Sequence, residues 1–293
     1  MRRKSPHPTP SKILTRRQIP KVPNSPPQTT RGANHQVKDT YTKEFAPTQL
    51  NNPILIEGLP GLGLVGKIAI RHLIKQLKAK KFAYLYSPHF PYFVLVNKKG
   101  NVRLLRGAFY YVKDPNNKHD VILFTGDSQS QTIEGQYDIA EKMLTFAKKH
   151  DVQTIVTIGG YRMESTEKPK VIAAGTNQNI LDQAMNAGAT VSSTGSPIVG
   201  TAGLILGLAR FKHINALCLL GETRGYLPDP LSARSVIEVL KNMFNLNVDM
   251  ATLDEEVNKA DKMVIRLQKI EETRALQAVE TRKEEDKKTT YIS

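Results

Sequence analysis

The 293-residue sequence has very little cysteine and no long apolar run. Its single cysteine excludes an intramolecular disulfide framework and a cysteine-based zinc site. That residue, Cys218, lies within an apolar segment, which favours a buried thiol over a reactive nucleophile. No stretch is apolar enough for a transmembrane helix, and the charged N-terminus has no apolar core of the secretory type. We therefore expect a cytoplasmic protein.

The sequence also lacks a recognisable metal or nucleophile motif. Its seven histidines are isolated, with no H-x-x-x-H pair and no neighbouring cysteine. The nearest approach to a G-x-S-x-G turn is Gly195-Ser196, which Pro197 interrupts. We therefore assign no catalytic, cofactor-binding or metal-ligating residue, expect no cofactor, and do not expect an enzyme.

Positive charge is concentrated at the N-terminus. The chain has 42 Lys or Arg against 27 Asp or Glu, and residues 1–48 hold ten of the former, two of the latter and eight of the 17 prolines. Because such a segment has few apolar residues with which to form a core, it predicts a disordered, basic, proline-rich arm over 1–48. The arm lacks the interleaved aromatic residues on which bases stack, so nucleic-acid binding is kept only as an alternative.

Residues 49–250 alternate between short apolar runs and segments with helical periodicity. This alternation predicts an α/β domain with a mostly parallel sheet covered by helices on both faces. A hairpin over 92–112 makes the expected sheet mixed. The expected strands are 53–57, 82–86, 92–96, 102–112, 120–125, 153–158, 171–174 and 215–220, and the expected helices are 64–77, 132–150, 179–186, 200–211 and 230–244.

Residues 251–293 differ from the α/β domain because they are highly charged. Their apolar residues form a single stripe and no other core-forming pattern. The segment predicts a charged helix followed by a flexible C-terminal tail. Its apolar residues are spaced alternately four and three apart, as in a coiled-coil seam. The stripe packs either on its own domain or on another subunit, and both remain open; its members are Leu253, Val257, Ala260, Val264 and Leu267.

The most prominent motif is a glycine-rich turn at 58–66, in which Gly61, Gly63 and Gly66 satisfy G-x-G-x-x-G. A dinucleotide site also needs an acid after the second strand, but no acid occurs between Glu57 and Asp114. A P-loop is excluded because no Ser or Thr follows the lysine. The pattern therefore predicts a tight strand-to-helix turn, in which a side chain at Gly61 or Gly63 would destabilise the fold.

This turn and two later blocks, at 157–161 and 218–230, resemble the archaeal-type proteasome assembly chaperone family in order and spacing. The match runs from about residue 53 to residue 249. The resemblance implies a phosphorylase-like, mixed and mostly parallel sheet flanked by helices, without an enzymatic site. It also implies a homo-oligomer that binds proteasome core-particle subunits, α-subunits above all, and assists their assembly without ATP.

The resemblance further implies a C-terminal tail that enters pockets on the α-subunit ring, and such tails usually end hydrophobic–Tyr–any. This chain ends Thr290-Tyr291-Ile292-Ser293, so its tyrosine stands one place early. The partner-binding residues that we expect are Tyr291, Ile292 and Ser293. The alternatives to the chaperone are an enzyme on a phosphorylase-like or dinucleotide-binding scaffold, and a nucleic-acid-associated protein that uses the basic arm.

Overall fold

One large sheet organises the chain. The computed structural model describes residues 38–46, 48–113, 119–163 and 168–258. Within them, nine strands form the sheet in the order β1 (Tyr41–Glu44), β3 (Lys80–Tyr86), β6 (Gly107–Val112), β7 (Val121–Gly126), β2 (Ile54–Glu57), β8 (Thr154–Arg162), β11 (Asn215–Thr223), β9 (Val171–Gly175) and β10 (Thr190–Val191). The central strands β7, β2, β8 and β11 run parallel, whereas β1, β3 and β6 on one side and β9 on the other add antiparallel pairs.

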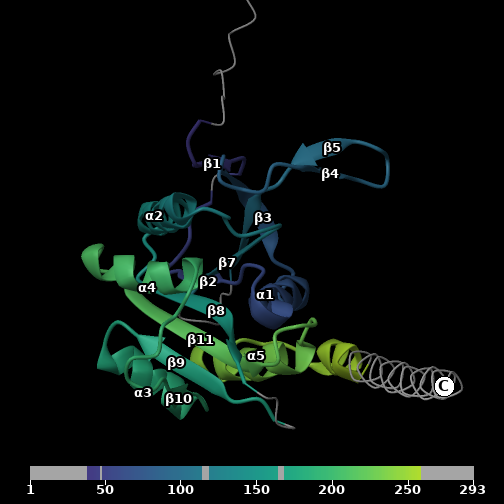
Figure 1. Ribbon diagram of the computed structural model, residues 1–293. Helices are drawn as coiled ribbons and strands as arrows, with labels where there is room; N and C mark the ends of the chain where they lie inside the picture. The colour runs from purple at the N-terminus through teal and green to yellow at the C-terminus, as the bar shows by residue number, and fades with distance from the viewer. Residues whose placement is uncertain (1–37, 47, 114–118, 164–167, 259–293) are drawn as a thin grey trace, which may run out of the picture. The chain divides into compact units, whose positions relative to one another are not determined.

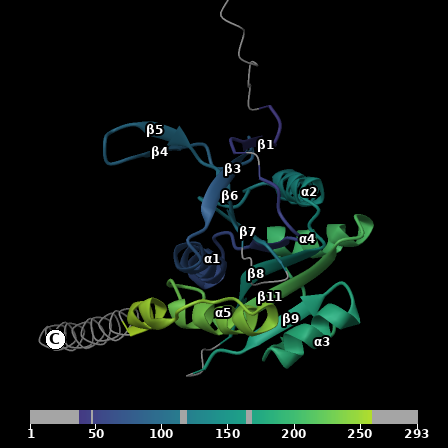
Figure 2. The same ribbon diagram turned by 180° about the vertical axis from the view of Figure 1, so that it is seen from behind.

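Helices cover both faces of this sheet (Figures 1 and 2). One core contains side chains of three helices, and the opposite core contains side chains of the other two. The first three are α1 (Val65–Gln76), α3 (Gln178–Asn186) and α5 (Pro230–Phe244), and the other two are α2 (Ile133–Lys149) and α4 (Thr201–Phe211). The predicted mixed α/β fold with helices on both faces is confirmed.

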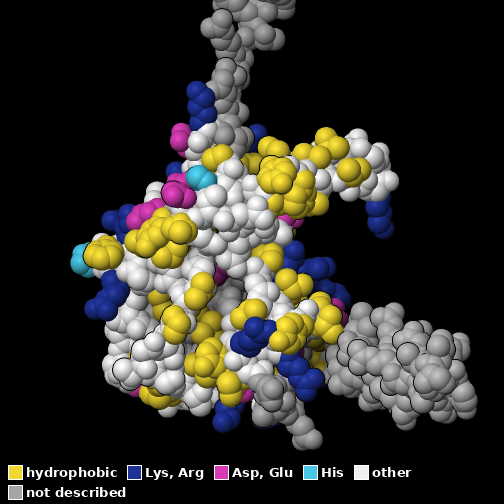
Figure 3. Space-filling model, viewed as in Figure 1, with side chains coloured by type: hydrophobic (Ala, Val, Ile, Leu, Met, Phe, Trp, Pro, Cys, Tyr) yellow, Lys and Arg dark blue, Asp and Glu magenta, His cyan; other side chains and the backbone are white. Residues whose placement is uncertain are grey.

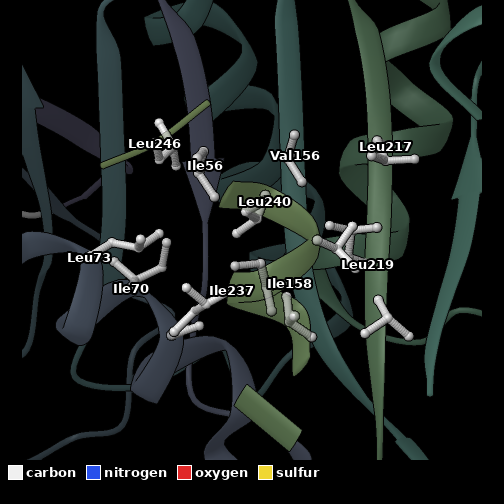
Figure 4. Close-up of a cluster of buried hydrophobic side chains, with 14 of the residues drawn as sticks. Ile56, Ile70, Leu73, Val156, Ile158, Leu217, Leu219, Ile237, Leu240 and Leu246 are labelled. Atoms are coloured by element: carbon white, nitrogen blue, oxygen red, sulfur yellow. The ribbon is translucent and has the colours of Figure 1, made fainter. Parts of the chain in front are cut away.

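The central strands are buried on both faces, which explains their continuous apolar sequences. On β2, Ile54 and Ile56 belong to the core beneath α1 and α5, while Leu55 belongs to the core beneath α2 and α4. Figure 4 shows the first core, where side chains from β2, β8 and β11 lie against Ile237 and Leu240 of α5. The alternation places the last residue of β2, Glu57, on the α2 and α4 face.

Two strands are longer than expected. The predictions ended β8 and β11 before their glycines, but β8 continues to Arg162 and β11 to Thr223. The two ends pair in parallel, with Gly160 opposite Gly221. Neighbouring elements pack so closely over these positions that a side chain would not fit there. A Cβ at Gly221 would lie 2.3 Å from Ser232 Oγ of α5.

The expected strand over 102–112 is two strands. β5 (Val102–Leu104) pairs only with β4 (Val94–Val96), in a separate two-stranded hairpin, whereas β6 joins the main sheet. The break lies at Leu105, which is buried, and Arg106, whose backbone N–H donates to Asp127. The expected hairpin is therefore present, but it lies outside the main sheet.

The boundary at residue 48 is wrong, because β1 lies within the predicted arm and pairs antiparallel with β3. The rings of Tyr41 and Tyr86 stack across this pair with centroids 5.5 Å apart. These aromatic contacts explain why the end of the basic segment is ordered on the sheet. Residues 1–37 of the expected arm lie outside the described residues.

The expected C-terminal helix begins as predicted, since residues 251–258 are helical. Leu253 is fully buried in the core beneath α5, and Arg234 of α5 donates to Asp254 at 2.5 Å. The start of the apolar stripe therefore packs on its own domain. Ala260, Val264, Leu267 and the tail lie outside the described residues.

Candidate functional site

The three sequence blocks that carry the resemblance meet at one edge of the sheet. They follow or contain the carboxyl ends of the parallel strands β2, β8 and β11, which lie at the same edge, where α/β proteins bind their ligands. The glycine turn is joined to the third block by two backbone hydrogen bonds. Gly63 N–H donates to Gly225 O at 3.4 Å, and Asp229 N–H donates to Gly63 O at 2.8 Å.

The side chain of Asp229 fixes this junction further. It caps α5 by accepting the Ser232 N–H at 2.9 Å, and it accepts the Thr223 hydroxyl at 2.7 Å. The Thr223 hydroxyl in turn accepts the Gly225 N–H at 3.1 Å. One carboxylate therefore links the end of β11, the loop after it and the start of α5.

The glycines of the turn differ in how much space surrounds them. Gly63 has a φ of +57°, and a Cβ there would lie 2.5 Å from Thr223 Oγ1, so the expectation of strain at Gly63 is confirmed. Gly61 has extended backbone, and the nearest atom to a Cβ there would be Gln129 Nε2 at 3.4 Å. The expectation that a side chain at Gly61 is costly is therefore wrong.

A pocket of about 440 Å³ lies at this edge. It is bounded by the glycine turn, by the end of β8 and by the segment 197–202 that leads into α4. Two glutamines in its wall are held in place. Gln129 Nε2 donates to Pro60 O at 2.7 Å, and Gln136 Nε2 donates to Ser130 O at 2.9 Å while its Oε1 accepts the hydroxyl of Thr201.

The pocket also contains a buried acid. Glu57 is only 1% exposed; its Oε1 accepts the Leu59 N–H at 2.9 Å, and its Oε2 has no hydrogen-bond partner. Burial raises the pKa of Glu57 to about 8, although the Leu59 N–H opposes this shift. The carboxyl group is therefore mainly protonated at neutral pH.

Glu57 begins a row of polar side chains across the sheet. The register places Glu57 of β2 opposite Thr157 of β8, and Thr157 opposite Cys218 of β11. Burial raises the pKa of the Cys218 thiol to about 12, although a hydrogen bond with Thr157 opposes it. The prediction that Cys218 is a buried thiol is confirmed.

The strand order does not match a dinucleotide site. In that fold the second strand lies beside the first and carries the ribose-binding acid. Here the strand after the glycine turn and α1 is β3, and two strands, β6 and β7, separate it from β2. β3 ends at Tyr86 and Ser87, and the Ser87 hydroxyl accepts the Thr40 hydroxyl at 2.7 Å and the His89 N–H at 3.1 Å.

A second surface feature is the β4–β5 hairpin, which extends away from the sheet (Figure 1). Its hydrophobic side chains lie on the molecular surface (Figure 3). Tyr92 is 100% exposed, Val96 66% and Val102 65%. Isolated two-stranded hairpins are only marginally stable in water. Exposed apolar side chains clustered on a hairpin are typical of a protein-protein interface.

The hairpin is attached to the domain by an ion pair. Both terminal nitrogens of Arg103 donate to the Asp127 carboxylate, at 2.6 and 2.9 Å. Burial opposes ionisation of Asp127, but the hydrogen bonds from Arg103 and Arg106 and the charge of Lys67 outweigh it, so the pKa of Asp127 is lowered. A bidentate pair of this kind orients the strand that carries it.

We expect Asp127→Asn to loosen the hairpin by about 1 kcal/mol, because it removes the ionic partner of Arg103 but keeps the side-chain size. Since the pKa of Asp127 is lowered in the folded state, its contribution is present above its unfolded pKa and declines as the pH falls through the folded one. Hydrogen exchange of the 94–104 amides measures this. Faster exchange there, with α5 unchanged, is the predicted result, and unchanged exchange contradicts it.

The expected partner-binding residues Tyr291, Ile292 and Ser293 lie outside the described residues. Neither the burial of Glu57 nor the exposure of the hairpin was predicted from the sequence. The signal for Glu57 is an acid that ends a fully apolar strand at the carboxyl edge of the sheet.

Within the described ranges, no group of three or more His, Cys, Asp or Glu is placed to hold a metal ion. No helix in these ranges has the length and apolar character to cross a membrane.

Together these features define an α/β protein with a parallel central sheet and a glycine-lined carboxyl edge. The chain belongs to the PAC2 family, whose profile matches residues 55–268. It is 32% identical to the uncharacterized protein MJ1210 of Methanocaldococcus jannaschii, over 85% of this chain and 95% of that protein. This result confirms the family to which the sequence blocks pointed.

Two crystal structures from Pyrococcus furiosus are similar to this fold. PbaB, an archaeal proteasome activator, is 37% identical with a TM-score of 0.75, over 79% of this chain and 99% of PbaB. PbaA, an archaeal homolog of proteasome-assembly chaperone, is 27% identical with a TM-score of 0.65, over 86% of this chain and 99% of PbaA.

Proposed function

We propose that this protein is a non-enzymatic, ATP-independent chaperone that binds proteasome core-particle subunits and assists their assembly in the cytoplasm. The observation that carries the proposal is the similarity, over most of both chains, to PbaA and PbaB, a proteasome-assembly chaperone homolog and a proteasome activator. The strand order around the glycine turn supports it, because it does not provide the acid-bearing neighbour strand of a dinucleotide enzyme.

We assign the contact with α-subunits to the C-terminal residues Tyr291, Ile292 and Ser293. Tyr291 is the only aromatic residue after Phe244, and it stands among charged residues that offer it no core. An aromatic anchor of this kind, with an adjacent aliphatic side chain, suits an apolar pocket on a partner.

Interferometry with immobilised α-subunits tests this assignment. Deleting residues 291–293 should weaken binding by at least about 30-fold, because losing an anchor costs about 2 kcal/mol and several tails in one oligomer multiply the loss. Tyr291→Phe is the matched control, and it should retain most of the affinity because it keeps the ring. Full affinity of the deletion variant, with its oligomer intact, would instead assign binding to the folded domain.

We assign self-association of the proposed homo-oligomer to the β4–β5 hairpin. Its exposed apolar side chains project from the domain, and obligate interfaces between identical subunits are rich in such residues. The hairpin is also fixed to the body through Arg103 and Asp127, so a partner that binds it is held in a defined orientation.

The combined variant Val94→Thr, Val96→Thr, Val102→Thr should lower the mass of the oligomer in light scattering. Threonine retains the strand preference of valine but exposes a hydroxyl, so folding is preserved while the apolar contact is weakened. Val199→Thr is the control, because Val199 is 88% exposed and lies outside the hairpin. An unchanged mass for the triple variant would exclude the hairpin as the interface.

A second candidate function is activation of the finished proteasome. It is favoured by the higher identity and TM-score of the PbaB match than of the PbaA match. Peptidase assays on preassembled core particles separate the two, because an activator raises the rate of peptide cleavage whereas an assembly chaperone acts only while subunits associate.

A further inference from the structure

The pocket at the carboxyl edge contains one buried polar atom without a protein partner. Glu57 lines the pocket and is 1% exposed, and its Oε2 has no hydrogen bond, whereas its Oε1 is satisfied by Leu59. Buried polar atoms in folded proteins nearly always have partners, so an unsatisfied carboxyl oxygen in a pocket wall indicates a missing hydrogen-bonding group. Oε1 already accepts the Leu59 N–H, so we place the proton of the neutral carboxyl group on Oε2, the oxygen without a partner.

Two helices begin at the wall of the pocket. α1 and α4 begin beside the pocket, which Gly66 and Ala202 of their first turns line. Neither helix has a side-chain hydrogen bond at its N-cap, Leu64 or Gly200. Backbone N–H groups at such ends, together with the helix dipole, favour a negatively charged group.

The rest of the wall combines one cation with apolar surface. Arg162 lines the pocket, with its guanidinium 4.6 Å from the ring centroid of Tyr226. Leu59, Ile158 and Ile198 supply apolar surface. A ligand that pairs with the cation and covers the apolar side chains has an oxyanion at one end and an apolar body at the other.

We propose that the pocket binds a small organic oxyanion, a carboxylate or a phosphate monoester, which accepts a hydrogen bond from the Glu57 carboxyl group and lies against the N-termini of α1 and α4. This inference goes beyond the proposed function and does not depend on it. A site of this kind makes the stability of the glycine turn, and of the loops joined to it through Gly63 and Asp229, responsive to a metabolite.

The proposal requires binding to weaken with rising pH. The Glu57 pKa of about 8 means that the carboxyl group loses its donor proton above that pH and then repels an anion. Thr157 of β8 lies opposite Glu57 in the sheet, and Gln136 of α2 and Ala202 of α4 line the same pocket; all three side chains are neutral. The ionisable groups nearby are the Cys218 thiol, which stays protonated, and Tyr161 and Arg162 in the pocket wall.

Isothermal titration calorimetry with hexanoate and with phenyl phosphate, each at pH 7 and pH 9, tests the proposal. Hexanol is the control for the apolar part of the ligand alone, and inorganic phosphate is the control for the anionic group alone. We expect one of the two organic anions to bind at pH 7 at least tenfold more tightly than hexanol and inorganic phosphate. Which anion binds more tightly identifies the headgroup. Affinity should fall roughly tenfold by pH 9, because each pH unit above the pKa of the donor reduces its protonated fraction about tenfold.

The variant Glu57→Gln separates this role from a purely structural one. Its amide keeps a donor at the Oε2 position but cannot ionise, so binding should persist at pH 7. The decrease in log affinity from pH 7 to pH 9 should be at most half of that in the native protein. Arg162→Met should weaken binding at both pH values. Absence of binding by both organic anions, equal binding of hexanol, or the same pH dependence in Glu57→Gln would overturn the proposal.

Discussion

At pH 9 the variant Glu57→Gln should be more stable than the native protein by up to about 4 kcal/mol, and at pH 5 the two should differ little. Burial raises the pKa of Glu57 from 4.5 to about 8, so the folded state holds a proton that the unfolded chain releases. Stability of the native protein therefore falls as the pH rises from about 4.5 to about 8. Glutamine removes this loss because it keeps the shape and cannot ionise.

Thermal unfolding over pH 5 to 9 measures the effect, which should reach roughly 10 °C at pH 9 for a domain of this size. Glu256→Gln is the matched control, because Glu256 is exposed and its loss should leave the pH profile unchanged. Parallel pH profiles for Glu57→Gln and the native protein would show that Glu57 ionises freely in the fold.

Gly58→Ala should destabilise the domain by about 3 kcal/mol or more and reduce its soluble yield, because the new methyl group has no space. A Cβ at Gly58 would lie 2.2 Å from Gly66 O and 2.7 Å from Ile70 Cγ1. The first is a backbone atom of α1, so relief of the clash requires α1 to move away from β2.

Gly61→Ala is the control for this prediction, because a Cβ at Gly61 meets only Gln129 Nε2, at 3.4 Å. The free energy of unfolding of Gly61→Ala, measured by urea denaturation, should stay within about 0.5 kcal/mol of the native value, the usual range of a surface substitution. Equal destabilisation of the two variants would contradict the packing described for the turn.

Periodicity predicted most of the elements because the core is regular. The five expected helices are present, and the expected helix over 230–244 matches α5. Two strands, β8 and β11, were predicted too short because glycine was taken as the end of a strand. Gly160 and Gly221 instead lie inside paired strands, and packing of Leu62 and Ser232 over them requires glycine. Such contacts join distant parts of the chain, so sequence spacing does not reveal them.

The site was predictable only in part. The sequence predicts the glycine turn between a strand and a helix, but its partners Gly225 and Asp229 are brought to it by the parallel order of β2, β8 and β11. The role of Glu57 depends on its burial and on the empty hydrogen-bonding position of Oε2. The exposure of the β4–β5 hairpin follows from a break at Leu105, which strand propensity did not indicate.

We propose above all that this protein binds proteasome core-particle subunits and promotes their assembly without nucleotide. Native gel electrophoresis of separated α- and β-subunits, mixed with and without the protein in nucleotide-depleted buffer, tests it most directly. We expect a complex of the protein with α-subunits and faster formation of the core particle. Core-particle formation at the same rate, with no complex between the protein and either subunit, would contradict it.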